Sequence, residues 1–317
     1  MKKRIAMILL SLLLAIGLAL FAAALFFGHR DIPAQELTDK YATAPSSFAR
    51  VGGMPVHFRD EGNPADSIPL VLLHGTGSSL HTFDPWVESL KKDRRVVRMD
   101  LPGFGLTGPF PDRNYSTDHY VEFLEEFLTH MKIRTCMLGG NSLGGQIAWR
   151  FAAAHPNRVE KLILIDAAGY PRNIKSEPIA FKIAGIPLLN RILTYVTPRS
   201  LVRSSVENVY ADKSKVDDAL VDRYYELSLR EGNRQALVDR IRTFRDPEPT
   251  RLIKDIRQPT LVLWGAEDLL IPVETARLFH EDLPNDTLVI LPGTGHVPME
   301  ESPGESLAPL LHFLEQP

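Results

Sequence analysis

The chain has only one cysteine, Cys136, among its 317 residues, which excludes an intrachain disulfide and a cysteine-based metal site. Neither sign of charge predominates, because 36 basic and 39 acidic residues leave a net charge of −3, and no sustained basic stretch follows residue 30. This balance argues against a nucleic-acid partner.

The sequence has no internal repeats, and it has no low-complexity segments beyond the N-terminus. No cluster of histidine or carboxylate side chains has the spacing of a metal site.

Apolar residues, in contrast, are abundant. They make up 44% of the chain, so a sequence of this length can bury a large core. We therefore expect one large folded domain with room for an insertion, and we do not expect disorder.

The N-terminus contains a long hydrophobic run. Residues 5–27 carry no charge, and these 23 positions would extend about 34 Å as a helix, compared with about 30 Å for the hydrocarbon core of a bilayer. Lys2, Lys3 and Arg4 precede the run, so the positive-inside rule places the N-terminus in the cytoplasm. We predict that residues 1–30 form a single transmembrane signal anchor and that the folded body is periplasmic or extracellular. A cleaved signal peptide is the alternative.

Strand-like apolar runs dominate the chain after a linker that we expect at residues 31–50. The runs lie at residues 56–62, 68–75, 94–103, 136–142, 161–169, 259–265 and 287–293. From the second run onward, helical patterns separate many of them, which predicts a mainly parallel α/β sheet with helices on both faces. Residues 170–256 have helical patterns, such as those at 181–196 and 214–229, without a clear strand. We expect them to form a helical cap inserted into a core of residues 51–169 and 257–317.

The stretch GGNSLGGQIA at residues 139–148 matches the GxSxG pattern of a nucleophile elbow. Ser142 is flanked by Gly140 and Gly144, and a strained strand-to-helix turn needs such small residues. An apolar strand precedes the pattern and an amphipathic helix follows it, as the elbow requires. Ser142 is therefore a candidate catalytic nucleophile.

A nucleophilic serine needs a base and an acid that orients the base. His296 follows the last apolar run in the loop LPGTGH, and we predict that it is the general base. Asp268, in GAED after the run at 259–265, is the predicted acid. Asp166, at the end of LILID, is the competing acid, and Glu267 is a weaker one. The order Ser142, Asp268, His296 is typical of one hydrolase class and differs from that of two unrelated protease folds.

An oxyanion hole requires two donors near the serine. We predict that they are the backbone N–H groups of Leu143, which follows the serine, and Thr76, in the loop HGTGSS. His74 is expected to hold this loop rather than to act in catalysis. The glycine-rich loop DLPGFGLTGPF lacks the pattern and the lysine of a phosphate-binding loop, so we expect it to line the pocket, with Phe104 as a wall residue.

HGTGSS, DLPGFG, GNSLGG, GAED and GTGH, in this order, make residues 50–317 resemble the α/β-hydrolase fold family. The resemblance implies an eight-stranded, mostly parallel sheet, a helical cap, and a Ser-His-Asp mechanism without a cofactor. Ser142 argues against the members of this family whose nucleophile at the elbow is an aspartate. The expected function is hydrolysis of a small-molecule acyl substrate, a carboxylic ester. In the expected cap, Lys182, Arg191, Arg199 and Arg203 alternate with apolar residues, as in a basic amphipathic surface that rests on an anionic bilayer and admits lipid-derived esters. Ordinary packing of the cap explains the same pattern and is the favoured interpretation.

Two alternatives to ester hydrolysis remain open at this point. The GNSLGG elbow resembles that of the meta-cleavage product hydrolases, which cut carbon–carbon bonds in vinylogous diketo acids. The cap, however, offers no arginine that can be assigned as a clamp for the substrate carboxylate. The other alternative is a non-catalytic, membrane-tethered receptor or scaffold with the same fold. The complete set of catalytic residues argues against it.

Overall fold

The computed structural model describes residues 30–171, 175–186, 189–243 and 249–316, together with positions 4, 7, 11, 14, 15, 17 and 18. An eight-stranded sheet forms the centre of the molecule, in the order β1-β2-β4-β3-β5-β6-β7-β8. Strand β2 pairs antiparallel with β1 and β4, and all other neighbouring strands are parallel. The strands are β1 Ser46–Val51, β2 Met54–Glu61, β3 Leu70–Leu73, β4 Val96–Met99, β5 Cys136–Asn141, β6 Val159–Ile165, β7 Thr260–Gly265 and β8 Asp286–Leu291.

The predicted eight-stranded, mostly parallel sheet is thus confirmed, and all seven strand-like runs correspond to strands. Strand β1 was not predicted. It lies mostly within the stretch expected to be a linker. Its strand pattern is hard to recognise because polar residues are interspersed with its buried ones.

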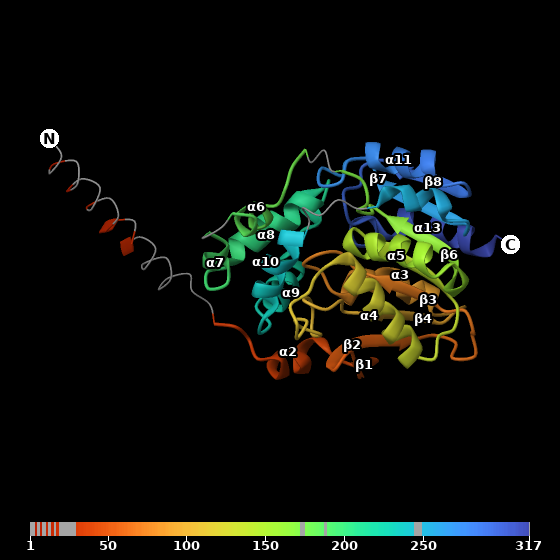
Figure 1. Ribbon diagram of the computed structural model, residues 1–317, viewed down its shortest axis with the longest axis horizontal. Coiled ribbons are helices and arrows are strands. Elements are labelled where there is room, and N and C mark those ends of the chain that lie inside the picture. Colours follow the sequence, from red (N-terminus) through yellow and green to blue (C-terminus); the bar gives the residue numbers. More distant parts are fainter. Residues whose placement is uncertain are drawn as a thin grey trace.

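Helices cover both faces of the sheet (Figure 1). Alternate residues of each central strand face opposite layers, as in β3, where Leu70 and Leu72 pack with α3 and α13, whereas Val71 and Leu73 pack with α4 and α5. The helices of the core are α3 Asp84–Leu90, α4 Thr117–His130, α5 Leu143–Ala154, α11 Glu274–Asp282, α12 Pro298–Glu301 and α13 Pro303–Glu315. Burial on both faces explains why β3, β4, β5 and β7 have no exposed residue.

In the described part of the chain between β6 and β7, five further helices gather at one end of the sheet (Figure 1). We call them the cap: α6 Ile179–Ala184, α7 Leu189–Leu193, α8 Arg199–Val209, α9 Asp218–Ser228 and α10 Asn233–Thr243. Helix α9 begins where the side chain of Asp217 accepts a hydrogen bond of 2.7 Å from the N–H of Leu220. The helical pattern at 181–196 is split into α6 and α7, and helices α8 and α10 were not recognised in the sequence.

A short segment before the sheet holds the cap and the core together. Residues 31–42, which we call the N-terminal arm, include helix α2 Ala34–Tyr41. Ile32 pairs with the cap, since its N–H donates to Leu229 O at 2.7 Å and its carbonyl accepts from Glu231 N at 3.0 Å. The buried side chain of Leu37 packs with Leu106 of the core and Leu227 of the cap. The arm therefore makes specific contacts where the sequence suggested a flexible linker.

The structure does not support the membrane anchor, and this corrects the localisation predicted from residues 5–27. A bilayer-spanning helix needs about 20 consecutive, mostly apolar residues. Within the described part of the chain, no helix is both long enough and apolar enough to cross a membrane. Most of residues 5–27 lie outside the described residues. The predicted periplasmic or extracellular placement of the body, which depended on this anchor, is therefore not retained.

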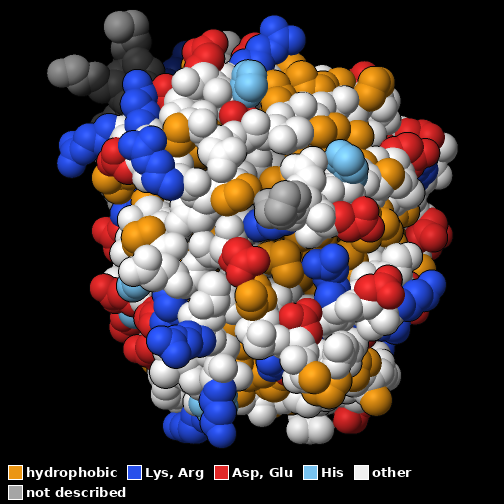
Figure 2. All heavy atoms as spheres, turned by 90° about the vertical axis from the view of Figure 1, so that its right-hand side faces the viewer, with side chains coloured by type: hydrophobic (Ala, Val, Ile, Leu, Met, Phe, Trp, Pro, Cys, Tyr) orange, Lys and Arg blue, Asp and Glu red, His pale blue; other side chains and the backbone are white. Residues whose placement is uncertain are grey.

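The charges are well mixed on the face that carries the C-terminal helices. Figure 2 shows basic and acidic side chains interspersed over this face, with small apolar areas between them. This distribution agrees with the balanced charge of the sequence.

Candidate active site

Ser142 lies on a sharp turn between β5 and α5. Its backbone has φ 54° and ψ −112°, which non-glycine residues rarely adopt. The N–H of Ser142 donates to Ile165 O at 3.0 Å, which ties the turn to the carboxyl end of β6. The parallel strands bring the carboxyl ends of β3, β5, β6, β7 and β8 to the same edge of the sheet, where ligands of such folds bind. The turn therefore presents Ser142 at this edge.

Close backbone approach requires glycine on both sides of Ser142. A Cβ atom on Gly144 would lie 2.1 Å from the carbonyl oxygen of Leu73, and one on Gly140 would lie 2.2 Å from the backbone of Gly144. Neither contact can be relieved by moving a flexible side chain. The glycines that the sequence pattern singled out are thus required by packing of α5 against β3 and β5.

His296 and Asp268 meet at the same edge of the sheet. The Nδ1 atom of His296 lies 2.6 Å from Oδ2 of Asp268, and both side chains are buried. The other carboxylate oxygen of Asp268 accepts hydrogen bonds from the N–H groups of Leu270 at 2.8 Å and Ile271 at 2.9 Å. Three donors therefore fix the Asp268 carboxylate, and the carboxylate in turn orients the imidazole.

The loop that carries His296 is held from two directions. The N–H of His296 donates to Val209 O at 2.8 Å, at the end of the cap helix α8. The amide of Asn141 donates to His296 O at 2.9 Å and to Ile165 O at 3.2 Å. Asn141 thus links β5, β6 and the histidine loop.

The two predicted oxyanion donors belong to the elbow and to the loop that packs on it. Leu143 is the first residue of α5, so its N–H has no acceptor within the helix. Thr76 lies in the loop after β3, which packs so closely on the elbow that a Cβ on Gly75 would be 2.9 Å from Asn141 Oδ1. His74 supports this loop, because Nδ1 donates to Gly75 O at 2.8 Å and Nε2 accepts from Leu101 N at 2.9 Å. Burial lowers the pKa of His74, in agreement with this neutral structural role.

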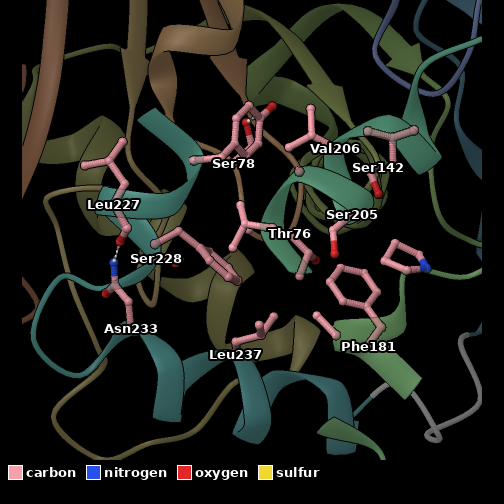
Figure 3. Close-up of a pocket in the computed structure, with 18 of the residues that line it drawn as sticks. Thr76, Ser78, Ser142, Phe181, Ser205, Val206, Leu227, Ser228, Asn233 and Leu237 are labelled. Atoms are coloured by element: carbon pink, nitrogen blue, oxygen red, sulfur yellow. Dashed lines mark hydrogen bonds between the residues drawn. The ribbon is translucent and has the colours of Figure 1, made fainter. Parts of the chain in front are cut away.

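A cavity of about 150 Å³ lies between the core and the cap, and both Ser142 and His296 line it. Figure 3 shows Ser142 and Ser205 at one end and Leu227 and Asn233 at the opposite end. Most of the wall is apolar and comes from the cap. The residues from cap helices are Ala180, Phe181, Leu201, Val202, Ser205, Val206, Val209, Tyr224, Leu227, Ser228, Asn233, Arg234 and Leu237. Phe104, predicted as a wall residue, also lines the cavity.

Polar contacts join the cap to the core beside this cavity. Tyr224 of α9 donates to Glu300 Oε2 at 2.8 Å and lies 3.3 Å from Ser78 Oγ. Arg223 pairs with the same Glu300 carboxylate. Burial raises the pKa of Tyr224, so its hydroxyl keeps its proton and can donate. This network fixes one wall of the cavity against the loop that contains Thr76.

Arg234 is the one arginine among the described residues that line the cavity, and an acidic residue binds it. Its Nε and Nη2 atoms donate to Oδ1 of Asp31 at 3.0 and 2.6 Å. The basic residues Arg199 and Arg203 of the cap pair with Asp218 on α9. These arginines therefore contact carboxylates of the chain itself.

The structure brings the predicted residues of the core together at one edge of the sheet, whereas the residues of the cap that line the cavity were not predicted from the sequence. Helix α8 carried a usable signal, since Leu201, Val202, Ser205, Val206 and Val209 follow a helical spacing and all line the cavity. The proximity of Asp166 to Asp268 and His296 was also missed. A carboxylate oxygen of each aspartate and a ring nitrogen of His296 lie within 4.8 Å of one another. The separate positions of these residues in the sequence could not indicate this.

Comparison with known proteins gives consistent matches. The family model described as alpha/beta hydrolase fold matches residues 68–303. An uncharacterized hydrolase of Bacillus subtilis (strain 168), YugF, is 30% identical over 83% of this chain and 95% of its own length. The 2-hydroxy-6-oxo-6-(2'-aminophenyl)hexa-2,4-dienoic acid hydrolase of Metapseudomonas resinovorans is 28% identical over 89% of this chain and 96% of its own. The crystal structure of a bacterial membrane phospholipase A is similar with a TM-score of 0.73 and 27% identity, covering 99% of this chain and 98% of that one.

Proposed function

Because this chain belongs to the α/β-hydrolase fold family, and is therefore a hydrolase of that fold, we propose that it cleaves carboxylic esters with Ser142 as nucleophile. One observation carries the proposal. Ser142 on its strained turn lines the same cavity as His296, whose Nδ1 atom is held 2.6 Å from Asp268. This arrangement supplies the nucleophile, the base and the acid of acyl transfer.

The proposed reaction proceeds in two halves. His296 takes the proton of the Ser142 hydroxyl through Nε2 while the oxygen attacks the acyl carbonyl, and the N–H groups of Thr76 and Leu143 stabilise the oxyanion. The tetrahedral intermediate expels the alcohol, which receives the proton from His296. Water, deprotonated by His296, then attacks the acyl-enzyme and releases the acid and the free serine. Asp268 holds Nδ1–H throughout and stabilises the imidazolium.

The cavity favours an apolar acyl or alkyl group as the part of the substrate beyond the ester. Its wall is mainly apolar, and Phe181, Leu201, Val206 and Leu237 are among the residues that line it. Burial of a chain of methylene groups there contributes about 0.8 kcal/mol for each group. The similarity to a bacterial membrane phospholipase A supports lipid-derived esters as one substrate class.

A second candidate is carbon–carbon bond hydrolysis, which the relative from Metapseudomonas resinovorans supports by its name. A diketo acid carries a carboxylate, and an arginine is its natural partner. Arg234 is the arginine in the described cavity wall, but Asp31 already accepts two of the hydrogen bonds that this arginine donates. A neutral ester requires no such partner, so this contact favours ester hydrolysis.

The test is a series of p-nitrophenyl esters of increasing acyl length, measured beside a vinylogous diketo acid. We expect the wild-type protein to hydrolyse the esters and to prefer acyl chains longer than acetate. A kcat/KM for the diketo acid that exceeds every ester value would contradict the assignment and would support the second candidate.

The division of the chain into two parts remains part of this proposal. The core comprises residues 51–169 and 257–317, and the cap comprises residues 170–256 and supplies most of the specificity-determining wall.

A further inference from the structure

Asp166 is a buried acid that the proposed mechanism does not use. It follows β6 directly, has no exposed surface, and adopts φ 45°, which is unusual for a residue other than glycine. Its Oδ1 atom accepts a hydrogen bond of 3.0 Å from Gly265 N. Its Oδ2 atom is inaccessible to solvent and has no hydrogen-bond partner among the described residues. A buried oxygen of this kind requires an explanation.

The neighbour of Asp166 is Asp268. Carboxylate oxygens of the two residues and a ring nitrogen of His296 all lie within 4.8 Å of one another. A metal ion is a poor explanation, because the 2.6 Å contact between His296 and Asp268 leaves no room for an ion between those two atoms. Two ionised carboxylates at this distance and without solvent would repel each other strongly.

One of the two carboxyl groups must therefore hold a proton, and the hydrogen bonds identify it. Asp268 accepts from His296, Leu270 and Ile271, all of which stabilise the ionised form. Asp166 accepts from a single N–H group. Burial and the negative charge of Asp268 raise the pKa of Asp166 well above its usual range, and the charge of Glu301 adds to this shift. The nearby titratable groups are thus Asp268, Glu301 and His296.

We propose that Asp166 is a positioning residue whose protonated Oδ2 donates a hydrogen bond to the carboxylate of Asp268. The inference rests on the proposed Ser-His-Asp mechanism. Asp166 does not touch substrate, but it supplies a fourth donor to the acid that orients His296. The bond fixes the rotamer of Asp268 and disperses part of its negative charge, so that Asp268 holds the imidazolium less tightly.

Asp166→Asn and Asp166→Leu separate this role from the alternatives. An asparagine amide is neutral at every pH, can donate through nitrogen to Asp268, and can accept through oxygen from Gly265 N. We expect Asp166→Asn to keep kcat/KM for a p-nitrophenyl ester within about threefold of wild type, with the same pH profile. Leucine has a similar size but cannot donate. We expect Asp166→Leu to lower kcat/KM by about 10- to 100-fold and to move the acidic limb of its pH profile to higher pH.

Two kinetic results would overturn the proposal. If Asp166→Asn lowers kcat/KM by about 100-fold or more, the charge of an ionised Asp166 is what the enzyme needs. If Asp166→Leu lowers kcat/KM while the acidic limb stays in place, the residue has only a packing role. Either outcome leaves ester hydrolysis by the wild-type protein unaffected, so the proposed function is tested separately.

A spectroscopic measurement covers the case in which a variant does not fold. In the Ser142→Ala protein at about pH 7, where an ordinary aspartate is ionised, infrared spectra should contain the C=O stretching band of a buried carboxylic acid. The band should disappear in the Ser142→Ala/Asp166→Asn double variant. Absence of the band from the Ser142→Ala protein, or its persistence in a folded double variant, would refute the assignment. Because no turnover is required, this result does not depend on the identity of the substrate.

Discussion

At the scale of single residues, the acid of the site is defined by the hydrogen bonds it accepts. Asp268 and Glu267 are adjacent in the sequence, and only Asp268 contacts His296, whereas Glu267 accepts from Thr294 N at 3.0 Å. The sequence predicted Asp268 as the acid from its place after a strand, with Asp166, which also follows a strand, and Glu267 as competitors. The relation between Asp166 and Asp268 could not be predicted, because it depends on β6 and β7 being neighbours in the sheet.

Asp268→Asn should lower kcat by about 10³- to 10⁴-fold, because an amide at this position stabilises the wrong tautomer of His296. The matched control is Glu267→Gln, which changes the neighbouring carboxyl group in the same way and should alter kcat by less than about tenfold. Steady-state kinetics on one ester provide the measurement. Similar losses in the two variants would show that the contact of 2.6 Å to His296 has no special importance.

Asp166 should also affect how stability depends on pH. Its pKa is raised by burial and by Asp268, whereas an unfolded aspartate has a pKa of about 3.9. The folded protein therefore binds a proton that the unfolded chain releases, so this contribution to stability is present below about pH 4 and is lost as pH rises toward the folded pKa. Asp166→Asn removes this dependence. We expect its free energy of unfolding to increase relative to wild type as pH rises above about 4, as measured by urea denaturation. Parallel curves for the two proteins would contradict the expectation.

At the scale of elements, the sequence predicts the core better than the cap. The strands β3, β5 and β7 are continuous apolar runs because both of their faces are covered, and such runs are easy to recognise. The cap helices have one face on the cavity and one in solvent, and the single helical pattern at 181–196 does not show that the chain forms two short helices, α6 and α7, in this region. Their arrangement also depends on contacts with distant parts of the chain, including the arm and Glu300.

The close packing of the first turn of α5 against β3 can be tested by adding a single methyl group. Gly144→Ala should destabilise the protein by about 2 kcal/mol or more, because the new Cβ would meet Leu73 O at 2.1 Å, and it should lower kcat/KM by displacing the N–H of Leu143. The control is Gly304→Ala in α13, where a Cβ would have no neighbour within 4 Å. That change should be neutral or stabilising by up to about 1 kcal/mol. Equal melting temperatures for the two variants would show that the close approach of α5 to β3 is not limiting.

The cap wall can be tested by narrowing the cavity from α10. Leu237 lines the cavity, so Leu237→Trp should raise KM for p-nitrophenyl octanoate by about tenfold or more and leave p-nitrophenyl acetate nearly unchanged. Arg242→Ala on the same helix is the control, because the Arg242 side chain is 60% exposed. An equal effect of Leu237→Trp on both esters would mean that the acyl chain does not occupy this part of the cavity.

At the scale of the whole molecule, the N-terminal arm joins parts of the chain that are about 200 residues apart in sequence, such as Asp31 and Arg234. The sequence suggested a linker here, since two prolines and many polar residues surround a few apolar ones. Leu37 is the buried apolar residue of the arm, and the few apolar residues of this stretch do not show which distant residues they contact. Such a contact is determined by tertiary structure and cannot be read from local pattern.

Leu37→Ala should therefore lower the free energy of unfolding by about 2–4 kcal/mol, since the side chain is 3% exposed and fills a contact between core and cap. Gln35→Ala, at an exposed position of the same helix, should change it by less than about 0.5 kcal/mol. Chemical denaturation of both variants gives the comparison. Indistinguishable midpoints would show that the arm does not stabilise the fold.

The central claim is that Ser142 performs ester hydrolysis, and the most direct test is the kcat/KM of wild type and Ser142→Ala on the same p-nitrophenyl ester. We expect measurable hydrolysis by the wild-type protein and a loss of about 10⁶-fold in kcat for Ser142→Ala, which in practice means activity at background. A Ser142→Ala protein that hydrolyses the ester at a rate comparable to wild type would contradict the account.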